Sequence, residues 1–309
     1  IFDGNYEIIS RGNYKNYNTN IFEKVLINDL KFSSNPKITP SGFVNKFNLL
    51  FKNITSEGEN SSNYKNKFSS ENFGSIFYDT SYPLKREGKF FDSFFTAKGT
   101  LMYSPNANKD LKTLDRKIDM NNIFTQNRLS LDNAVEGGQS LTVGGLYSLK
   151  DKGGNDLVKA GLATVLRDDE EINLPTKSTL NNKGSDFIGS LVFKPNENLK
   201  FDYNFSFDND FESSNYNLFK ADVSVNKFVT SFEFLQEDDE VGSESYLFNE
   251  MAYNFNDANS LKYRTRRNEK TDFTEFYNLI YEYKNDCLTA SIQYNKDYYS
   301  DNELKPTEE

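Results

Sequence analysis

The sequence predicts an all-β protein, an antiparallel up-and-down transmembrane β-barrel, and three observations lead to this prediction. After Gly138, ten stretches alternate apolar with polar residues. The connections between these stretches alternate short with long, as they do in barrels of outer membranes. The 309 residues also include 28 Phe and 19 Tyr. Phe suits the acyl region of a bilayer, and Tyr, with one polar tip, suits the headgroup boundary.

Residues 201–208 give the clearest alternation, because every odd position is aromatic and every even position is polar. Successive side chains on a strand point to opposite faces, so this strand has one apolar and one polar face. We expect the aromatic positions to face lipid: Phe201, Tyr203, Phe205 and Phe207. We expect the polar positions to face the lumen: Asp202, Asn204, Ser206 and Asp208.

Most of the ten stretches have about the 9–11 residues that a tilted membrane strand needs. In order they span 139–149, 156–167, 185–194, 198–208, 215–226, 228–237, 245–255, 259–267, 272–283 and 287–298. Before Gly138, strand-like runs occur near 21–32, 41–54, 70–79 and 90–104. Between them and the ten stretches, the polar residues Asn106–Asn122 indicate a long loop or an inserted segment. The total is roughly 14–16 strands.

The connections fall into two kinds. The short ones carry Gly, Pro, Asn and Asp, as hairpin loops do, and span 150–155, 195–197, the surroundings of Lys227, 256–258 and 284–286. The longer, acidic ones span 168–184, 209–214, 238–244, 268–271 and the tail from Tyr299. Because outer-membrane barrels place short turns in the periplasm, we assign the short connections to that side.

Two further strands carry candidate site residues. Lys262, Arg264 and Arg266 share one face of their strand, and a basic stripe is costly against lipid, so we expect it in the lumen. With Arg267 beside it, the stripe could contact an anionic ligand or a partner protein, but charges balanced by acidic residues of neighbouring strands are the default interpretation. Leu288 and Ile292 alternate with polar residues and are expected to face lipid.

Composition excludes several function classes. A net charge of −10 argues against nucleic acid, which needs a concentrated basic surface. The absence of histidine removes the Ser-His-Asp and Cys-His nucleophile arrangements, and we find no phosphate-binding loop, so we expect no enzyme, no cofactor and no metal site. Mean hydropathy is −0.73, and no run reaches the roughly 18 apolar residues of a spanning helix. The acidic loops 168–171 and 237–240 could bind divalent cations, but ordinary solvated loops are the default interpretation.

Several strings together resemble the C-terminal barrel of the LptD (OstA or Imp) family, in its alphaproteobacterial form. The first two strings are residues 186–208, and residues 127–138 together with the strand end 145–149. The other two are residues 281–292, and Tyr82-Pro83-Leu84 followed by residues 101–105. The resemblance covers 78–309, and its order and spacing are more specific than any single string. It implies a large outer-membrane barrel that places lipopolysaccharide (LPS) in the outer leaflet.

The resemblance also implies partners: LPS, outer-membrane lipids, an LptE-type plug lipoprotein, and a periplasmic LPS-bridge protein reached through a jellyroll domain. We expect residues 1–309 to be part of one barrel domain, with the jellyroll and the terminal gate strands outside this chain. Cys287, the single cysteine, matches the family position that bonds the barrel to the jellyroll. The family often has two adjacent cysteines there, whereas this chain has Asp286-Cys287. A single cysteine in an exported protein also favours a disulfide with a cysteine outside this segment. The alternative is a buried thiol that does not react.

Two other function classes stay open at this point. A porin or specific uptake channel of the outer membrane would have the same barrel pattern. A soluble or surface-attached all-β adhesin or enzyme would remain in solution without detergent and would bind calcium or sugar.

Overall fold

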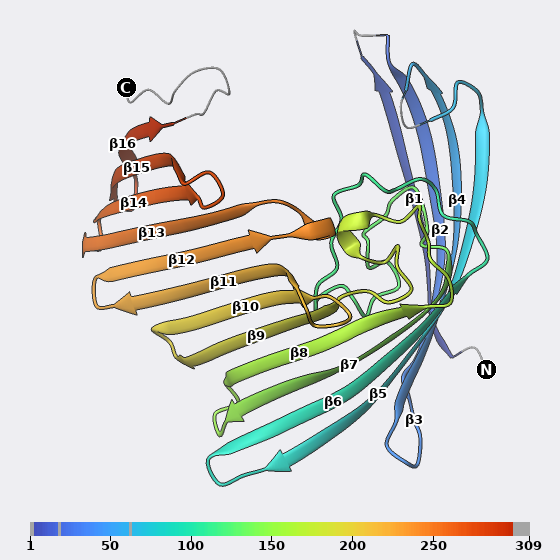
Figure 1. Ribbon diagram of the computed structural model, residues 1–309, viewed down its shortest axis with the longest axis horizontal. Coiled ribbons are helices and arrows are strands. Elements are labelled where there is room, and N and C mark those ends of the chain that lie inside the picture. Colours follow the sequence, from blue (N-terminus) through green and yellow to red (C-terminus); the bar gives the residue numbers. More distant parts are fainter. Residues whose placement is uncertain (1–2, 18–19, 62–63, 299–309) are drawn as a thin grey trace. The chain divides into compact units, whose positions relative to one another are not determined.

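The structure, a computed structural model, describes residues 3–17, 20–61 and 64–298. Within these ranges sixteen strands form one antiparallel up-and-down sheet (Figure 1). The strands β1, β2 and β4 to β16 pair in chain order, and the short strand β3 pairs only with β4. The first strands are β1 (Gly4–Asn16), β2 (Phe22–Ser34), β3 (Lys37–Ile38), β4 (Val44–Glu59), β5 (Ser69–Glu87), β6 (Phe91–Ser104), β7 (Gly138–Asp151) and β8 (Asp156–Arg167). The others are β9 (Phe187–Asn196), β10 (Leu199–Phe207), β11 (Ser214–Val225), β12 (Phe228–Glu237), β13 (Ser245–Asn256), β14 (Asn259–Asn268), β15 (Phe273–Lys284) and β16 (Thr289–Asp297).

The connections contain the short 3-10 helices η1 (Thr176–Ser178) and η2 (Asp239–Val241). In the described part of the chain, no helix has both the length and the apolar character needed to cross a membrane.

The ten strands predicted after Gly138 are confirmed, and their boundaries agree to within a residue or two. The predicted ranges 156–167 and 228–237 coincide with the observed strands β8 and β12. Before Gly138 the four predicted runs correspond to β2, β4, β5 and β6. The first three end later than predicted, and β5 has 19 residues, whereas β6 agrees with its prediction to within one residue. Strands β1 and β3 are not predicted. On β1, the face of Tyr6 and Ile8 continues through Ser10 and Gly12, so the apolar alternation fades after its first half.

The chain divides into two compact units. The first unit comprises Ile1–Lys85, Phe94–Leu146 and Leu162–Asp186, and the second comprises Arg86–Ser93, Tyr147–Gly161 and Phe187–Glu309.

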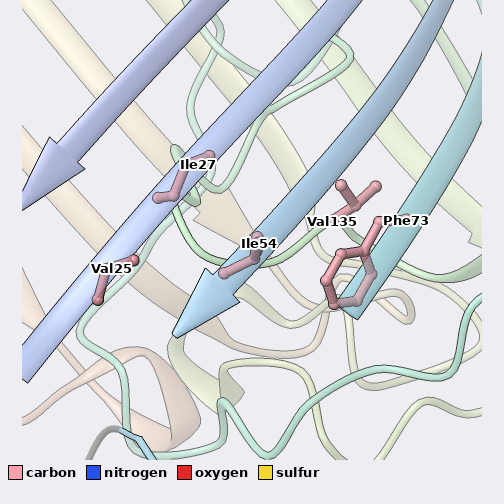
Figure 2. Close-up of a cluster of buried hydrophobic side chains, with 5 residues drawn as sticks. All are labelled: Val25, Ile27, Ile54, Phe73 and Val135. Atoms are coloured by element: carbon pink, nitrogen blue, oxygen red, sulfur yellow. The ribbon is translucent and has the colours of Figure 1, made fainter. Parts of the chain in front are cut away.

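In the first unit, residues 105–137, which connect β6 to β7 and are called the covering segment below, pack against one face of the sheet. That covered face carries Val25 and Ile27 of β2, Ile54 of β4 and Phe73 of β5. Val135 of the covering segment joins them in a buried cluster (Figure 2). Burying one such side chain contributes about 1.5–3 kcal/mol relative to leaving it exposed, so the cluster holds the segment against the strands.

The opposite face of the first unit is apolar and exposed. It carries Leu26, Leu30, Phe51, Ile76 and Leu101, each between 43% and 53% exposed. The strand register confirms the separation, since Leu30 lies opposite Phe51 while Asp29 lies opposite Lys52 on the covered face. An exposed apolar sheet face of this kind marks a surface that contacts a membrane or another apolar partner.

In the second unit, aromatic rings from four neighbouring strands follow one another across a single face of the sheet. The rings of Phe193 and Phe201 lie 6.3 Å apart, those of Phe201 and Phe219 6.0 Å, and those of Phe219 and Phe232 6.3 Å. Nearby, the Phe205 ring lies over Gly189, where an added Cβ would approach ring carbon Cζ to 2.0 Å. The ring contacts of Phe201, Tyr203 and Phe205 are thus made within the sheet, to the same strand or the next ones.

Candidate functional site

Strand β10 separates aromatic from polar side chains, and the neighbouring strands continue the separation. Tyr203 lies opposite Phe219 of β11, whereas Asp202 lies opposite Lys220. We call the side of the second unit that carries Phe201, Tyr203, Phe205 and Phe207 the aromatic face, and the side that carries Asp202, Asn204 and Ser206 the charged face. The structure therefore divides these residues as the sequence predicts. That the aromatic face meets lipid and the charged face the lumen stays a prediction.

Asp208 lies beyond the end of β10 and closes the following turn. Its carboxylate accepts hydrogen bonds from the Glu212 N–H (2.8 Å) and the Ser213 Oγ (2.9 Å). Desolvation raises the pKa of Asp208, but these hydrogen bonds outweigh it and hold the pKa below its usual value. Asp208 thus shapes the 208–213 connection instead of continuing the row of β10.

The basic residues of β14 lie on the charged face and are largely balanced there. Arg264 pairs with Glu250 of β13. Arg266 pairs with Glu275 of β15 at 3.0 Å, and its guanidinium lies 4.1 Å from the ring centroid of Tyr246. Within residues 3–17, 20–61 and 64–298, the structure records no ion pair for Lys262. For Arg264 and Arg266, neutralisation by neighbouring strands is the arrangement found.

Further ion pairs extend the charged face across the strands that precede β14. Lys200 and Asp202 of β10 are 2.7 Å apart, and Lys220 of β11 lies 2.5 Å from Glu233 of β12. The Tyr246 hydroxyl of β13 donates to the same Glu233 at 2.6 Å. These side chains are partly exposed, so each pair contributes at most about 1 kcal/mol. Together they make this surface hydrophilic, with positive and negative charges next to each other.

In the first unit the covering segment is fixed by a buried network around Glu136. The Arg128 Nε donates to this carboxylate at 2.8 Å, and Arg167, at the end of β8, binds it at 2.5 Å. Arg128 also donates to the hydroxyls of Ser140 (2.8 Å) and Thr142 (3.0 Å) on β7. Burial raises the pKa of Glu136, but the charges of Arg128 and Arg167 outweigh it and hold the pKa below its usual value.

A second network joins the covering segment to β1, β2 and β4. Lys52 lies 2.8 Å from Asp29 and donates to the backbone oxygen of Asp132 at 3.0 Å. Arg11 of β1 bridges the two carboxylates, at 3.0 Å from Asp29 and 2.9 Å from Asp132. Lys52 and Asp29 are each 3% exposed, so their charges depend on each other for stabilisation.

Uncharged groups complete the attachment. The Asn106 side chain continues the sheet beyond β6, because its Oδ1 accepts from the Gly74 N–H (2.9 Å) and its Nδ2 donates to the Asn72 carbonyl (3.0 Å). Asn108 accepts from the Gly137 N–H and donates to Glu171 of the 168–186 connection, both at 2.7 Å. The covering segment therefore contacts both the strands and the next long connection.

Comparison with known proteins identifies the family of this two-faced sheet. The sequence profile described as "LptD: LPS transport system D" matches residues 34–232, more than half of the chain. The chain belongs to the LptD family. It is accordingly an integral outer-membrane protein with the up-and-down strand order of a transmembrane β-barrel, and part of an LPS transport system.

Other comparisons add little to this LptD-family assignment. A five-residue mutant of Rh. blastica porin is similar at a TM-score of 0.36 and 9% identity, over 95% of this chain and 93% of that chain. A triple mutant of Rhodopseudomonas blastica porin gives a TM-score of 0.35 and 10% identity over the same shares. No curated protein matches the chain.

Two predicted site residues of this LptD-family chain lie just before β16. The strand begins at Thr289, not at 287, so Cys287 and Leu288 belong to the connection that precedes it. The predicted strand start at 287 is wrong because the Asn285 side chain accepts from the N–H groups of Cys287 (3.0 Å) and Leu288 (2.8 Å), which closes a turn there. Cys287 is exposed, and Ile292 on β16 is 77% exposed.

The acidic connections are engaged in contacts within the protein. Glu171 accepts from Asn108, as described above, and Lys270 lies 3.7 Å from Asp238. Among residues 3–17, 20–61 and 64–298, no three acidic or cysteine side chains are grouped so that they could hold a metal ion.

The sequence predicts a loop or insertion at 106–122 but not its role as a cover. The run Val25-Leu26-Ile27 could have predicted the cover. It places apolar side chains on both faces of β2, which indicates that both faces contact apolar groups. Leu129, Leu131 and Val135, which follow the predicted loop, supply that material and are at most 6% exposed.

Proposed function

We propose that this chain forms a wall of the barrel that assembles LPS at the cell surface. In this proposal the saccharide moves along the charged face while the acyl chains remain with the bilayer on the aromatic side. One observation carries it: β9 to β16 maintain an apolar and a hydrophilic face in register across eight strands. A molecule with an acidic sugar portion and acyl chains needs both environments at once.

The charged face of the second unit is also the surface we assign to a plug partner. Most of its residues are partly exposed, and they include apolar side chains such as Leu218, Phe248 and Ile280 among the ion pairs. A lipoprotein of the LptE type, which the family relationship suggests, would find mixed apolar and charged contacts there. The short connections would then face the periplasm, and a periplasmic LPS-bridge protein would deliver LPS from that side.

The covering segment has a separate role in this proposal. Held by two ionic networks and an apolar cluster, it fills space beside β2, β4 and β5 that would otherwise admit water. It would thereby limit leakage of small solutes through this part of the barrel.

Depletion of the full-length protein in cells tests the function. Newly synthesised, pulse-labelled LPS should stop reaching the outer leaflet, as measured by its accessibility to a surface-acting lipid A-modifying enzyme, while uptake of small solutes should not fall. If labelled LPS reached the surface at the normal rate and solute uptake fell instead, the protein would be a channel and the proposal would be wrong.

A further inference from the structure

A cavity of about 450 Å³ lies in the first unit between β1, β2 and the covering segment. Val25 and Ile27, which belong to the buried cluster, form part of its apolar lining. Leu114 of the covering segment lines the cavity and is 40% exposed. The cavity is therefore open to solutes, and it is separate from the charged face described above, which belongs to the other unit.

Three cationic side chains line this cavity, and they differ in how far they are already neutralised. Arg11 is committed to Asp29 and Asp132, at 3.0 and 2.9 Å. Lys15 is 3.9 Å from Glu23, close to the limit of an ion pair. For Arg116 the structure records no ion pair in the described ranges of the chain. Two carboxylates, Glu23 and Asp132, also line the cavity, and Arg11 neutralises Asp132. The two weakly neutralised cations, Lys15 and Arg116, favour an anionic ligand there.

The remaining lining suits a ring with hydroxyl groups. Asn13 and Asn133 each present an amide that can both donate and accept hydrogen bonds. Tyr64 offers a part-buried aromatic ring, whose negative face attracts C–H groups of positive polarity. Pockets of this kind combine an apolar lining with a few polar groups that fix orientation.

We propose that this cavity binds a sugar that carries a phosphate or carboxylate group, with Lys15 and Arg116 on the anionic group and Asn13, Asn133 and Tyr64 around the ring. The inference rests on the proposed function, because the transported LPS supplies sugars with such groups. The covering segment would then be a place where the saccharide pauses as well as a filling of the barrel.

Calorimetric titration of the full chain in detergent micelles tests the proposal, with glucosamine 6-phosphate as the probe. Glucosamine, which has the sugar ring without the phosphate, and inorganic phosphate, which has the anion without the ring, are titrated separately as controls. We expect the phosphorylated sugar to bind at least tenfold more tightly than either. The double variant Lys15→Gln/Arg116→Gln should weaken that binding at least tenfold.

The control double variant Lys24→Gln/Lys112→Gln also removes two positive charges, one from β2 and one from the covering segment, but neither residue lines the cavity. It should bind the probe like the wild type. Equal loss in both variants, or equal binding of inorganic phosphate and the sugar phosphate, would overturn the proposal. If the probe binds as expected while the depletion experiment shows normal LPS delivery, the site stands and the proposed function fails; the reverse result rejects the site alone.

Discussion

The two units handle charge on their sheets in opposite ways. In the first unit Arg128 and Glu136 have side chains only 2% and 3% exposed, enclosed between the strands and the covering segment. In the second unit Arg264 and Glu250 are 39% and 31% exposed on an uncovered face. Enclosed charges stabilise only as complete pairs, whereas half-exposed pairs are individually weak and replaceable. The difference means that the ion pairs of the first unit should contribute to stability as a network, whereas those of the second unit should contribute little individually.

The largest expected effect comes from breaking the enclosed network. Glu136→Gln leaves Arg128 and Arg167 buried without a counter-charge, and we expect it to lower the free energy of unfolding by about 3–5 kcal/mol. Glu250→Gln makes the same chemical change on the uncovered face and should cost at most about 1 kcal/mol. Urea unfolding of both variants in micelles measures the difference; similar losses would mean that the covering segment encloses nothing.

The apolar cluster gives the next comparison. Ile54 is 0% exposed beneath the covering segment, so Ile54→Ala should destabilise the protein by about 2–5 kcal/mol through lost burial and a cavity. Ile280 has the same side chain on the charged face of β15 but is only partly buried, and Ile280→Ala should cost clearly less. The same urea titration measures both. A larger loss at Ile280 would contradict the contrast between the units.

Acidification should weaken the first unit in a defined direction. Because the pKa of Glu136 in the folded protein lies below its usual value of 4.5, its contribution is complete above that value and is lost as the pH falls through the lowered pKa. The stability of the wild type should therefore decline below about pH 4.5 more steeply than that of Glu136→Gln. Parallel pH profiles of the two proteins would show that Glu136 does not titrate differently on folding.

Cys287→Ser should have the smallest effect on stability, because the residue is exposed in a turn whose hydrogen bond uses its backbone N–H. We propose that the thiol forms a disulfide with another domain of the full-length protein. The variant should then abolish the difference in gel mobility between reduced and oxidised samples. An unchanged mobility shift would exclude Cys287 from any such bond.

The sequence predicts the second unit better than the first, and the reason is physical. From β9 onward each strand has one mainly apolar and one mainly polar face, so a period of two in the sequence is enough to locate it, as at 228–237. In the first unit the covering segment places apolar residues such as Ile27 on the side that the barrel pattern reserves for polar ones, which obscures the period. Glu136 and Arg167 are 31 residues apart in the sequence, and no local pattern predicts that an ion pair will join them.

The site residues divide along the same line. The alternation at Phe201 and Asp202 follows directly from strand geometry and is found as predicted. Asp208 and Cys287 lie where strands end, and there side chains such as Ser213 and Asn285 decide the backbone path through single hydrogen bonds. Boundaries of this kind depend on individual contacts and not on a period.

Cysteine scanning of residues 201–207 tests the central claim most directly. In the Cys287→Ser background, single cysteines at each position of the full-length protein in liposomes would be treated with a water-soluble maleimide. We expect reaction at 202 and 204, little reaction at 206, where the side chain is buried, and protection at 201, 203, 205 and 207. Uniform reactivity along the strand, or protection at 202 and 204 with reaction at the odd positions, would contradict a wall with one face toward lipid and one toward water.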